Sequence, residues 1–187
     1  LASEIMMFGA FIACYIVLRM ANPNAFQPEY LHKFLDWRVG LFNTFVLIIS
    51  SFTMVMGVRY IRQNQSLKSA MMIATTALLG ALFLVVKIVF EYMHDYHLGI
   101  GPSTSVFWGC YFLLTGFHGI HVLMGVLYLL ALLPCMVSCH HCGTHRFNAD
   151  RHAHIELGGL YWHLVDLIWI FIFPLLYLIP LTQDLPK

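Results

Sequence analysis

Charged residues are scarce in this chain of 187 residues. Only 10% are Asp, Glu, Lys or Arg, whereas about a quarter is usual for a soluble domain. Hydrophobic residues make up 60% and the mean hydropathy is +0.76. This composition excludes a soluble globular protein and predicts an integral membrane protein. The net charge is only +1 and no basic tail is present, so nucleic acid is not an expected partner.

The sequence does not predict a disulfide-bonded fold, a repeat architecture or a cleavable signal peptide. The five cysteines are odd in number and do not predict a disulfide framework. No internal repeat stands out, and no cleavable signal precedes the first apolar run. Because that run begins at Leu1 without a methionine, we expect the natural N-terminus to lie upstream.

Five apolar runs are long enough to cross a bilayer. In lipid, every backbone N–H and C=O must be bonded internally, so we expect all five to be helices. The sequence predicts an all-α polytopic membrane protein, a bundle of five transmembrane helices that forms a single domain over residues 1–187. The expected helices cover about residues 1–20, 39–61, 68–92, 104–134 and 156–179.

Basic residues at the helix ends give the expected orientation. The second-to-third and fourth-to-fifth connections carry five of them: Arg59, Arg62, Lys68, Arg146 and Arg151. The opposite side carries four, partly offset by acidic residues: Arg19, Lys33, Arg38 and Lys187. Because basic residues favour the cytoplasmic side, we expect the C-terminus on the outer side.

The last apolar run contains His163 and Asp166, which lie three residues apart and share one helix face. Counted from Glu156 at about 1.5 Å per residue, Asp166 lies about 15 Å into the bilayer, near its centre. A carboxylate at that depth costs at least about 2.5–3.5 kcal/mol, so it must face protein. We expect both side chains to tie this helix to helix 104–134 or helix 68–92 through a buried polar network.

Helix 104–134 contains two histidines, His118 and His121, beside Thr115 and Gly119. Small and hydrogen-bonding residues let membrane helices pack closely. We interpret the histidines as members of the buried network, paired with groups such as Asp166. The alternative is that they bind haem or a metal, although haem b normally needs ligands from two helices at matched depth.

Further charges lie inside two other expected helices. Lys87 and Glu91 are four residues apart near the outer end of helix 68–92, a spacing at which they can pair. Glu4 has no basic residue within two helical turns along the sequence. An isolated acid in a membrane helix is a candidate for proton handling or for a specific contact.

The connection after helix 104–134 contains the ligand types that zinc uses. It reads Cys139-His140-His141-Cys142, with His145, His152 and His154 downstream. Only one such cysteine pair is present and the histidines would come from a loop, so we predict no metal site in this chain.

Several motifs occur in the order found in a known family. They are Ala2-Ser3-Glu4, Leu41-Phe42-Asn43-Thr44-Phe45-Val46-Leu47, Glu91-Tyr92, Thr115-Gly116-Phe117-His118-Gly119-Ile120-His121-Val122 and Tyr161-Trp162-His163-Leu164-Val165-Asp166-Leu167-Ile168-Trp169. Over essentially the whole chain they resemble subunit III of the haem–copper terminal oxidases, in particular cytochrome c oxidase subunit III. The last two motifs are highly specific together.

The resemblance implies an accessory, cofactor-free subunit of an aerobic respiratory oxidase. Haem and copper then belong to subunits I and II, where oxygen is reduced to water and protons are pumped. The expected partners are these subunits and membrane lipids, including bound phospholipid, with a respiratory supercomplex as a further option. The expected location is a respiratory membrane, the inner membrane of a bacterium. Glu4 matches the family's carbodiimide-reactive glutamate, so we expect this subunit to sustain proton uptake by subunit I.

Two departures from the family pattern leave alternatives open. Longer members of the family have seven helices, two of which precede the position of Leu1. Quinol-oxidase forms have five helices, as expected here. The electron donor is therefore either cytochrome c or quinol. Lys87 stands where many relatives have glutamine, which we interpret as local pairing with Glu91.

Three other functions compete with this interpretation. One is a nitric-oxide-reductase accessory protein within the same family. Another is a membrane cytochrome whose haem is held by His118, His121 and His163. The third is a proton-coupled transporter, for which inverted repeats would be expected and are not present. It would use Glu4, Lys87 and Asp166.

Overall fold

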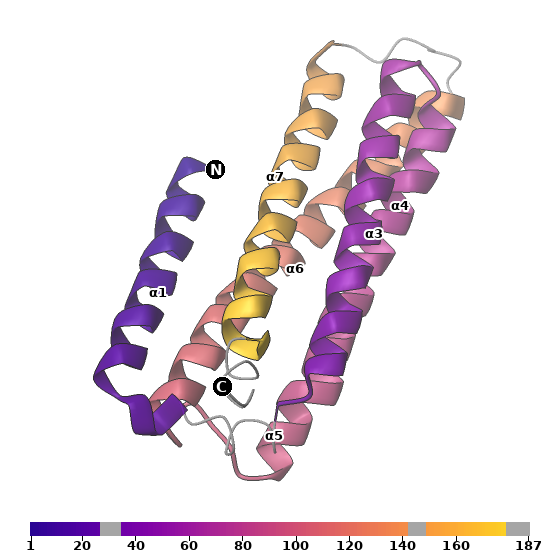
Figure 1. Cartoon of the computed structure of the whole chain (residues 1–187). Coiled ribbons are helices and arrows are strands. Elements are labelled where there is room, and N and C mark those ends of the chain that lie inside the picture. Colours follow the sequence, from indigo (N-terminus) through magenta and orange to yellow (C-terminus); the bar gives the residue numbers. More distant parts are fainter. Residues whose placement is uncertain (27–34, 142–148, 179–187) are drawn as a thin grey trace. The chain divides into compact units, whose positions relative to one another are not determined.

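The computed structural model describes residues 1–26, 35–141 and 149–178, without the side chains of residues 135, 138–141 and 149–152. The regular structure within these ranges is helical and contains no strand. In chain order (Figure 1) the elements are α1 (Ala2–Ala21), the 3₁₀ helix η1 (Pro23–Phe26), α3 (Trp37–Arg62), α4 (Ser66–Val86), the π-helix η2 (Lys87–Tyr92), α5 (Met93–His97), α6 (Val106–His141), α7 (Ala149–Phe173) and the π-helix η3 (Pro174–Leu178).

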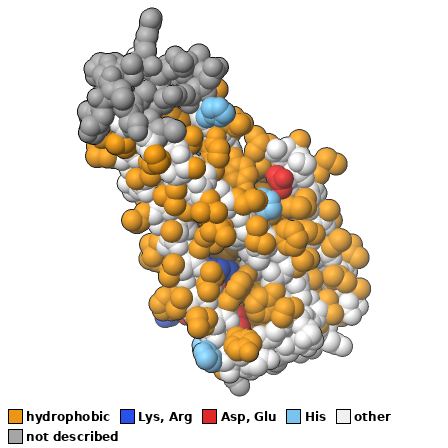
Figure 2. Space-filling model, turned by 180° about the vertical axis from the view of Figure 1, so that it is seen from behind, with side chains coloured by type: hydrophobic (Ala, Val, Ile, Leu, Met, Phe, Trp, Pro, Cys, Tyr) orange, Lys and Arg blue, Asp and Glu red, His pale blue; other side chains and the backbone are white. Residues whose placement is uncertain are grey.

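The prediction of five transmembrane helices is confirmed. Five stretches of the described chain are long and apolar enough to cross a membrane: Ala2–Ala21, Trp37–Arg62, Ser66–His97, Val106–Pro134 and Ala153–Leu178. Large hydrophobic side chains stay exposed along them, among them Met6, Phe52 and Leu78. Figure 2 shows hydrophobic side chains over most of one face. Such a surface requires lipid as its solvent, so the chain is an integral membrane protein.

Several helices extend beyond the ends expected from the sequence. The third span continues through η2 and α5 to His97, across residues expected to form a loop. α6 continues past Pro134 to His141, and α7 already begins at Ala149. The expected ends followed the loss of apolar side chains. Backbone hydrogen bonding does not depend on side-chain polarity, so these helices continue into polar sequence.

The chain divides into two compact units, to which α3, α6 and α7 all contribute. Unit 1 comprises Leu1–Thr44, Val85–Gly119 and Leu167–Lys187. Unit 2 comprises Phe45–Leu84 and Ile120–Asp166. A single domain over residues 1–187 therefore stays a prediction.

Trp162 of α7 is at the centre of the packing in unit 2. It is buried, and its Nε1–H donates a hydrogen bond to the Ser50 hydroxyl of α3 at 3.0 Å. A Cβ atom on Gly80 of α4 would lie 2.4 Å from the Trp162 ring, and one on Gly125 of α6 would lie 3.0 Å from it. Glycine therefore lets both helices approach the indole closely, as is usual between membrane helices.

An aromatic cluster connects α1, η1 and α6 in unit 1. The ring of Phe26 lies 5.5 Å from that of Tyr15 and 5.6 Å from that of Phe107, in both cases edge to face. The Tyr15 hydroxyl donates to the Leu175 carbonyl of η3 at 3.2 Å. Edge-to-face pairs of this kind add to the free energy gained by burial, so the cluster fixes α1 within unit 1.

Replacing Gly80 with alanine should lower the thermal unfolding midpoint of the detergent-solubilised protein. The added methyl group would overlap the Trp162 ring, and overpacking of this kind costs about 1–3 kcal/mol. The matched control is Gly9→Ala in α1, because nothing lies within 4 Å of a Cβ there. Equal midpoints for the two variants would contradict the close approach at Gly80.

Candidate functional site

A buried ion pair lies in the π-helix η2 of unit 1. Lys87 is 3% exposed and Glu91 is 7% exposed, and the ammonium group of Lys87 pairs with Oε2 of Glu91. Charged side chains within a membrane span are costly unless they are paired and hydrogen-bonded. The four-residue spacing seen in the sequence therefore corresponds to a contact in the structure.

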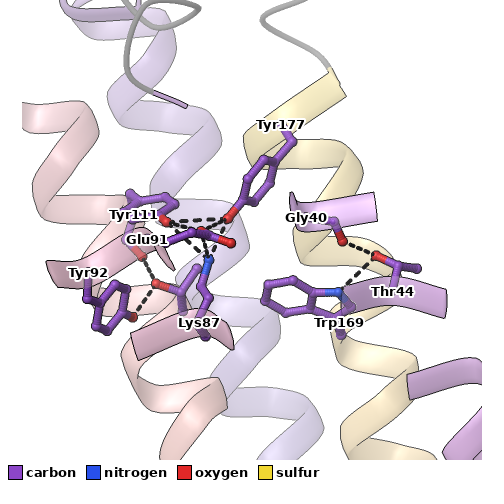
Figure 3. A network of polar contacts seen from close by, with 9 residues as sticks. Gly40, Thr44, Lys87, Glu91, Tyr92, Tyr111, Trp169 and Tyr177 are labelled. Carbon is purple, nitrogen blue, oxygen red and sulfur yellow. Dashed lines mark hydrogen bonds and ion pairs between the residues drawn. The ribbon is translucent and has the colours of Figure 1, made fainter. Parts of the chain in front are cut away.

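Two tyrosines from other helices complete this pair (Figure 3). Tyr111 of α6 donates to Glu91 Oε2 at 2.6 Å and accepts from Lys87 Nζ at 3.1 Å. Tyr177 of η3 makes the same two contacts, donating to Glu91 and accepting from Lys87. One carboxylate oxygen thus accepts three hydrogen bonds, and the cluster joins η2, α6 and η3. We name Lys87, Glu91, Tyr111 and Tyr177 the ion-pair cluster.

Aromatic rings surround the ammonium group of Lys87. Its Nζ atom lies 4.9 Å from the ring centroid of Tyr111, 5.1 Å from that of Tyr177, 5.2 Å from that of Trp169 and 5.9 Å from that of Tyr92. A cation within about 6 Å of a ring centroid is attracted by the ring, more strongly where water is excluded. The rings therefore replace part of the hydration that Lys87 loses.

Trp169 of α7 extends the cluster towards α3 within unit 1. Its Nε1–H donates to the Thr44 hydroxyl at 3.0 Å, and Thr44 donates to the Gly40 carbonyl at 2.8 Å. The ring of His118 stacks on Trp169, with centroids 5.0 Å apart. His118 is fully buried and is therefore an interior neighbour of the ion-pair cluster.

Both π-helices contribute residues to the cluster. η2 supplies Lys87 and Glu91, and η3 supplies Tyr177. η3 begins at Pro174, whose missing N–H removes one bond of the regular helical ladder. η2 contains neither proline nor glycine. π-helical turns are rare in proteins, and those that occur often lie at functional sites. Because both π-helices supply residues to this cluster, we take it as the candidate site.

The remaining residues of the predicted polar network belong to unit 2. His163 Nδ1 is hydrogen-bonded to the Ser51 hydroxyl of α3 at 2.7 Å. Helix 39–61 thus provides its partner, rather than either helix expected from the sequence. Asp166 and His121 are buried, and the His121 carbonyl accepts a bond from Tyr161 at 3.0 Å. Lys87, Glu91 and His118 belong to unit 1, whereas His121, His163 and Asp166 belong to unit 2, so one network that joins all six stays a prediction.

Sequence reasoning missed the two tyrosines and Ser51. A tyrosine in an apolar run is a detectable signal, because its hydroxyl needs a polar partner when it is buried. The sequence does not reveal which partner that is, since residues 87, 111 and 177 come together only through tertiary packing. Serine is too common in membrane helices to stand out.

A cavity lies in unit 2 between the end of α3 and the first half of α7. The cavity has a volume of about 430 Å³, and its polar walls include Arg59, Arg62 and Glu156. Val55, Val58 and Leu160 provide apolar walls. Arg62 pairs with Glu156 at 2.8 Å, with 65% and 40% of the two side chains exposed.

Glu4 and the cysteine- and histidine-rich connection are the remaining residues singled out in the sequence. Glu4 is half-buried in the first turn of α1. Of the cysteine- and histidine-rich connection, Cys142 and His145 lie outside the described residues, and the side chains of Cys139, His140, His141 and His152 are likewise not described. Within the described part of the chain, no group of three or more His, Cys, Asp or Glu side chains could hold a metal ion.

Removing one partner of the ion pair should destabilise the protein strongly. Lys87→Met leaves the Glu91 carboxylate buried without its cation, a change that typically costs about 3–5 kcal/mol. The double variant Lys87→Met/Glu91→Leu removes both charges and should recover most of this loss. The measurement is the unfolding midpoint in detergent of Lys87→Met, of Glu91→Leu and of the double variant.

The control for this cycle is Arg62→Gln, which breaks the more exposed Arg62–Glu156 pair and should cost less than about 1 kcal/mol. Strictly additive losses for Lys87 and Glu91 would contradict their coupling.

Comparison with known proteins assigns the chain to one family. The family model described as cytochrome c oxidase subunit III matches residues 1–180. The cytochrome c oxidase subunit 3 of Thermostichus vulcanus is 36% identical over 179 residues, which are 96% of this chain and 83% of the relative. That of Synechocystis sp. is 34% identical, over 96% of this chain and 72% of the relative. A probable quinol oxidase subunit 3 of Staphylococcus epidermidis is 29% identical over 184 residues, 98% of this chain and 87% of the relative. The chain therefore belongs to the cytochrome c oxidase subunit III family, whose members are subunits of membrane-bound terminal oxidases.

Proposed function

We propose that this chain is a non-catalytic accessory subunit III of an aerobic respiratory haem–copper oxidase. It holds no haem or copper itself and packs beside subunits I and II, which carry these cofactors and reduce oxygen. The ion-pair cluster is the observation that carries this proposal. Lys87 and Glu91 are bonded to Tyr111 and Tyr177 of the same unit, an arrangement suited to fixing helices and not to turning over a substrate.

The complex is of the cytochrome c oxidase type in this proposal. The two relatives named cytochrome c oxidase subunit 3 are 36% and 34% identical to this chain, against 29% for the relative named quinol oxidase subunit 3. This difference supports cytochrome c as the electron donor, with quinol as the alternative.

Glu4 has a separate role, in which it sustains proton uptake by subunit I. Only 11% of the apolar window of α1 is buried within this chain, so most of this helix is available to lipid or to a neighbouring subunit. A half-buried carboxyl group near its start can hold and release a proton beside such a neighbour. The position matches the family's carbodiimide-reactive glutamate.

The cavity at Arg59 and Arg62 holds an anionic phospholipid in this account. Its two guanidinium groups are suited to a phosphate, and its apolar walls at Val55, Val58 and Leu160 are suited to an acyl chain. Basic residues at a membrane surface attract anionic lipids. The cavity end is then cytoplasmic and the C-terminus lies on the outer side, in keeping with the distribution of basic residues.

Replacing Glu4 with glutamine should slow steady-state oxygen reduction by the purified complex or shorten its active lifetime during turnover. The glutamine amide has nearly the shape of the carboxyl group but cannot take up and release a proton as a carboxyl group does. The control is Ser3→Ala, an exposed neighbour in the same helical turn. Unchanged rate and lifetime in Glu4→Gln would remove Glu4 from the mechanism.

The double variant Arg59→Gln/Arg62→Gln should lose a bound anionic phospholipid. Each basic residue near the membrane surface contributes about 1 kcal/mol to such binding. Mass spectrometry of lipids that copurify with the complex provides the measurement. Lys68→Gln removes a basic residue that does not line the cavity and should retain the lipid. Identical lipid content in all three proteins would refute this site.

A further inference from the structure

A second cavity, of about 560 Å³, lies in unit 1 beside the ion-pair cluster. The start of α3 forms one side, and the segment from η2 to α5 forms another. The polar residues that line it are Asp36, Arg38, Glu91, His94, Asp95 and Tyr111. Trp37 begins one membrane span and His97 ends another, so the cavity lies at the membrane surface.

Two buried carboxylates in this cavity have unused acceptor capacity. Oε2 of Glu91 accepts bonds from the ion-pair cluster, but Oε1 is buried and has no partner among the described residues. Asp95 follows four residues later and is only 2% exposed. No hydrogen bond to its side chain comes from the part of the chain that the structure describes. Buried carboxylates without donors are costly, so these two favour an occupant that donates hydrogen bonds.

The charges around the cavity favour a cationic occupant. Three carboxylates, of Asp36, Glu91 and Asp95, stand against the two cations of Arg38 and Lys87. Lys87 is engaged by Glu91 within the cluster. The guanidinium carbon of Arg38 lies 5.8 Å from the ring centroid of Trp37, its own neighbour in α3. Asp36 already accepts a bond from the Arg38 backbone N–H at 3.0 Å. Asp95 is therefore the carboxylate that a cationic occupant of the cavity would stabilise most.

We propose that this cavity receives a basic side chain, lysine or arginine, from a neighbouring subunit of the oxidase. The inference rests on the proposed function, because it requires that this chain be part of a complex with several subunits. A zwitterionic lipid headgroup would bring a phosphate next to Asp36 and Asp95, which is unfavourable. A side chain brings only its cation and an apolar stem, for which Trp37 and Phe90 provide cavity walls.

Asp95→Asn should speed the dissociation of this subunit from the purified complex during washing in detergent. Truncating one partner of a buried charge pair raises the dissociation rate, here by at least about tenfold. The matched control is Asp36→Asn in the same cavity, because Asp36 is exposed and already has a donor. It should change the rate by much less. Equal rates for wild type and Asp95→Asn would overturn the proposal.

Chemical labelling of the wild-type complex tests the occupant without any variant that must fold. A water-soluble carbodiimide with a glycine ester modifies accessible carboxylates, and mass spectrometry locates them. The rate at which Asp95 is labelled should rise when the subunit is released, because the cavity that Asp95 lines is then no longer filled by the partner's side chain. Equal labelling of Asp95 in both states would overturn the proposal. Exposure of Asp95 after delipidation alone, with the subunit still bound, would identify a lipid instead and also overturn it.

This test separates failure of the inference from failure of the proposed function. Haem content and oxygen reduction of the purified complex are measured on the same sample. A complex with haem in which Asp95 stays equally reactive refutes only the docking site. A chain that purifies without any haem-containing partner refutes the proposed function as well.

Discussion

The buried pair of Lys87 and Glu91 is the interaction on which unit 1 depends. Neither charge can be solvated by lipid, so each must be compensated by protein. Tyr111 from α6 and Tyr177 from η3 provide hydroxyl groups, and aromatic rings surround the ammonium. Since these groups come from three different helices, the pair can be satisfied only when those helices pack in one arrangement. A polar cluster therefore specifies the packing in an environment where hydrophobic burial discriminates poorly.

Unit 2 obtains its packing in a different way. Glycines on α4 and α6 make room for Trp162, and single hydrogen bonds between hydroxyl groups and histidine or tryptophan side chains connect α3 with α7. The pair of Arg62 and Glu156 at a helix end joins two full charges in this unit. The two units thus combine close contact at small residues with one charged cluster. Both features suit a subunit whose role is to be a fixed partner for others.

The five spans and the family could be predicted from the sequence, because run length and motif order do not depend on tertiary detail. The pairing of Lys87 with Glu91 was also accessible, since four residues place both on one helix face. The tyrosines and Ser51 were not accessible, because their contacts join positions far apart in the chain. The helix ends were missed because α5, α6 and α7 include polar residues that the hydrophobic pattern assigned to loops. The cavity beside Asp95 likewise depends on how α3 and α5 come together in unit 1.

We propose that this chain supports a cofactor-bearing partner and carries no cofactor itself. Purification of the complex through this chain in mild detergent, followed by an optical spectrum and metal analysis, tests it most directly. We expect haem and copper in the intact complex and neither in the chain after it is stripped from its partners. Haem that stays with the stripped chain would contradict the account and would point to His118, His121 and His163 as ligands.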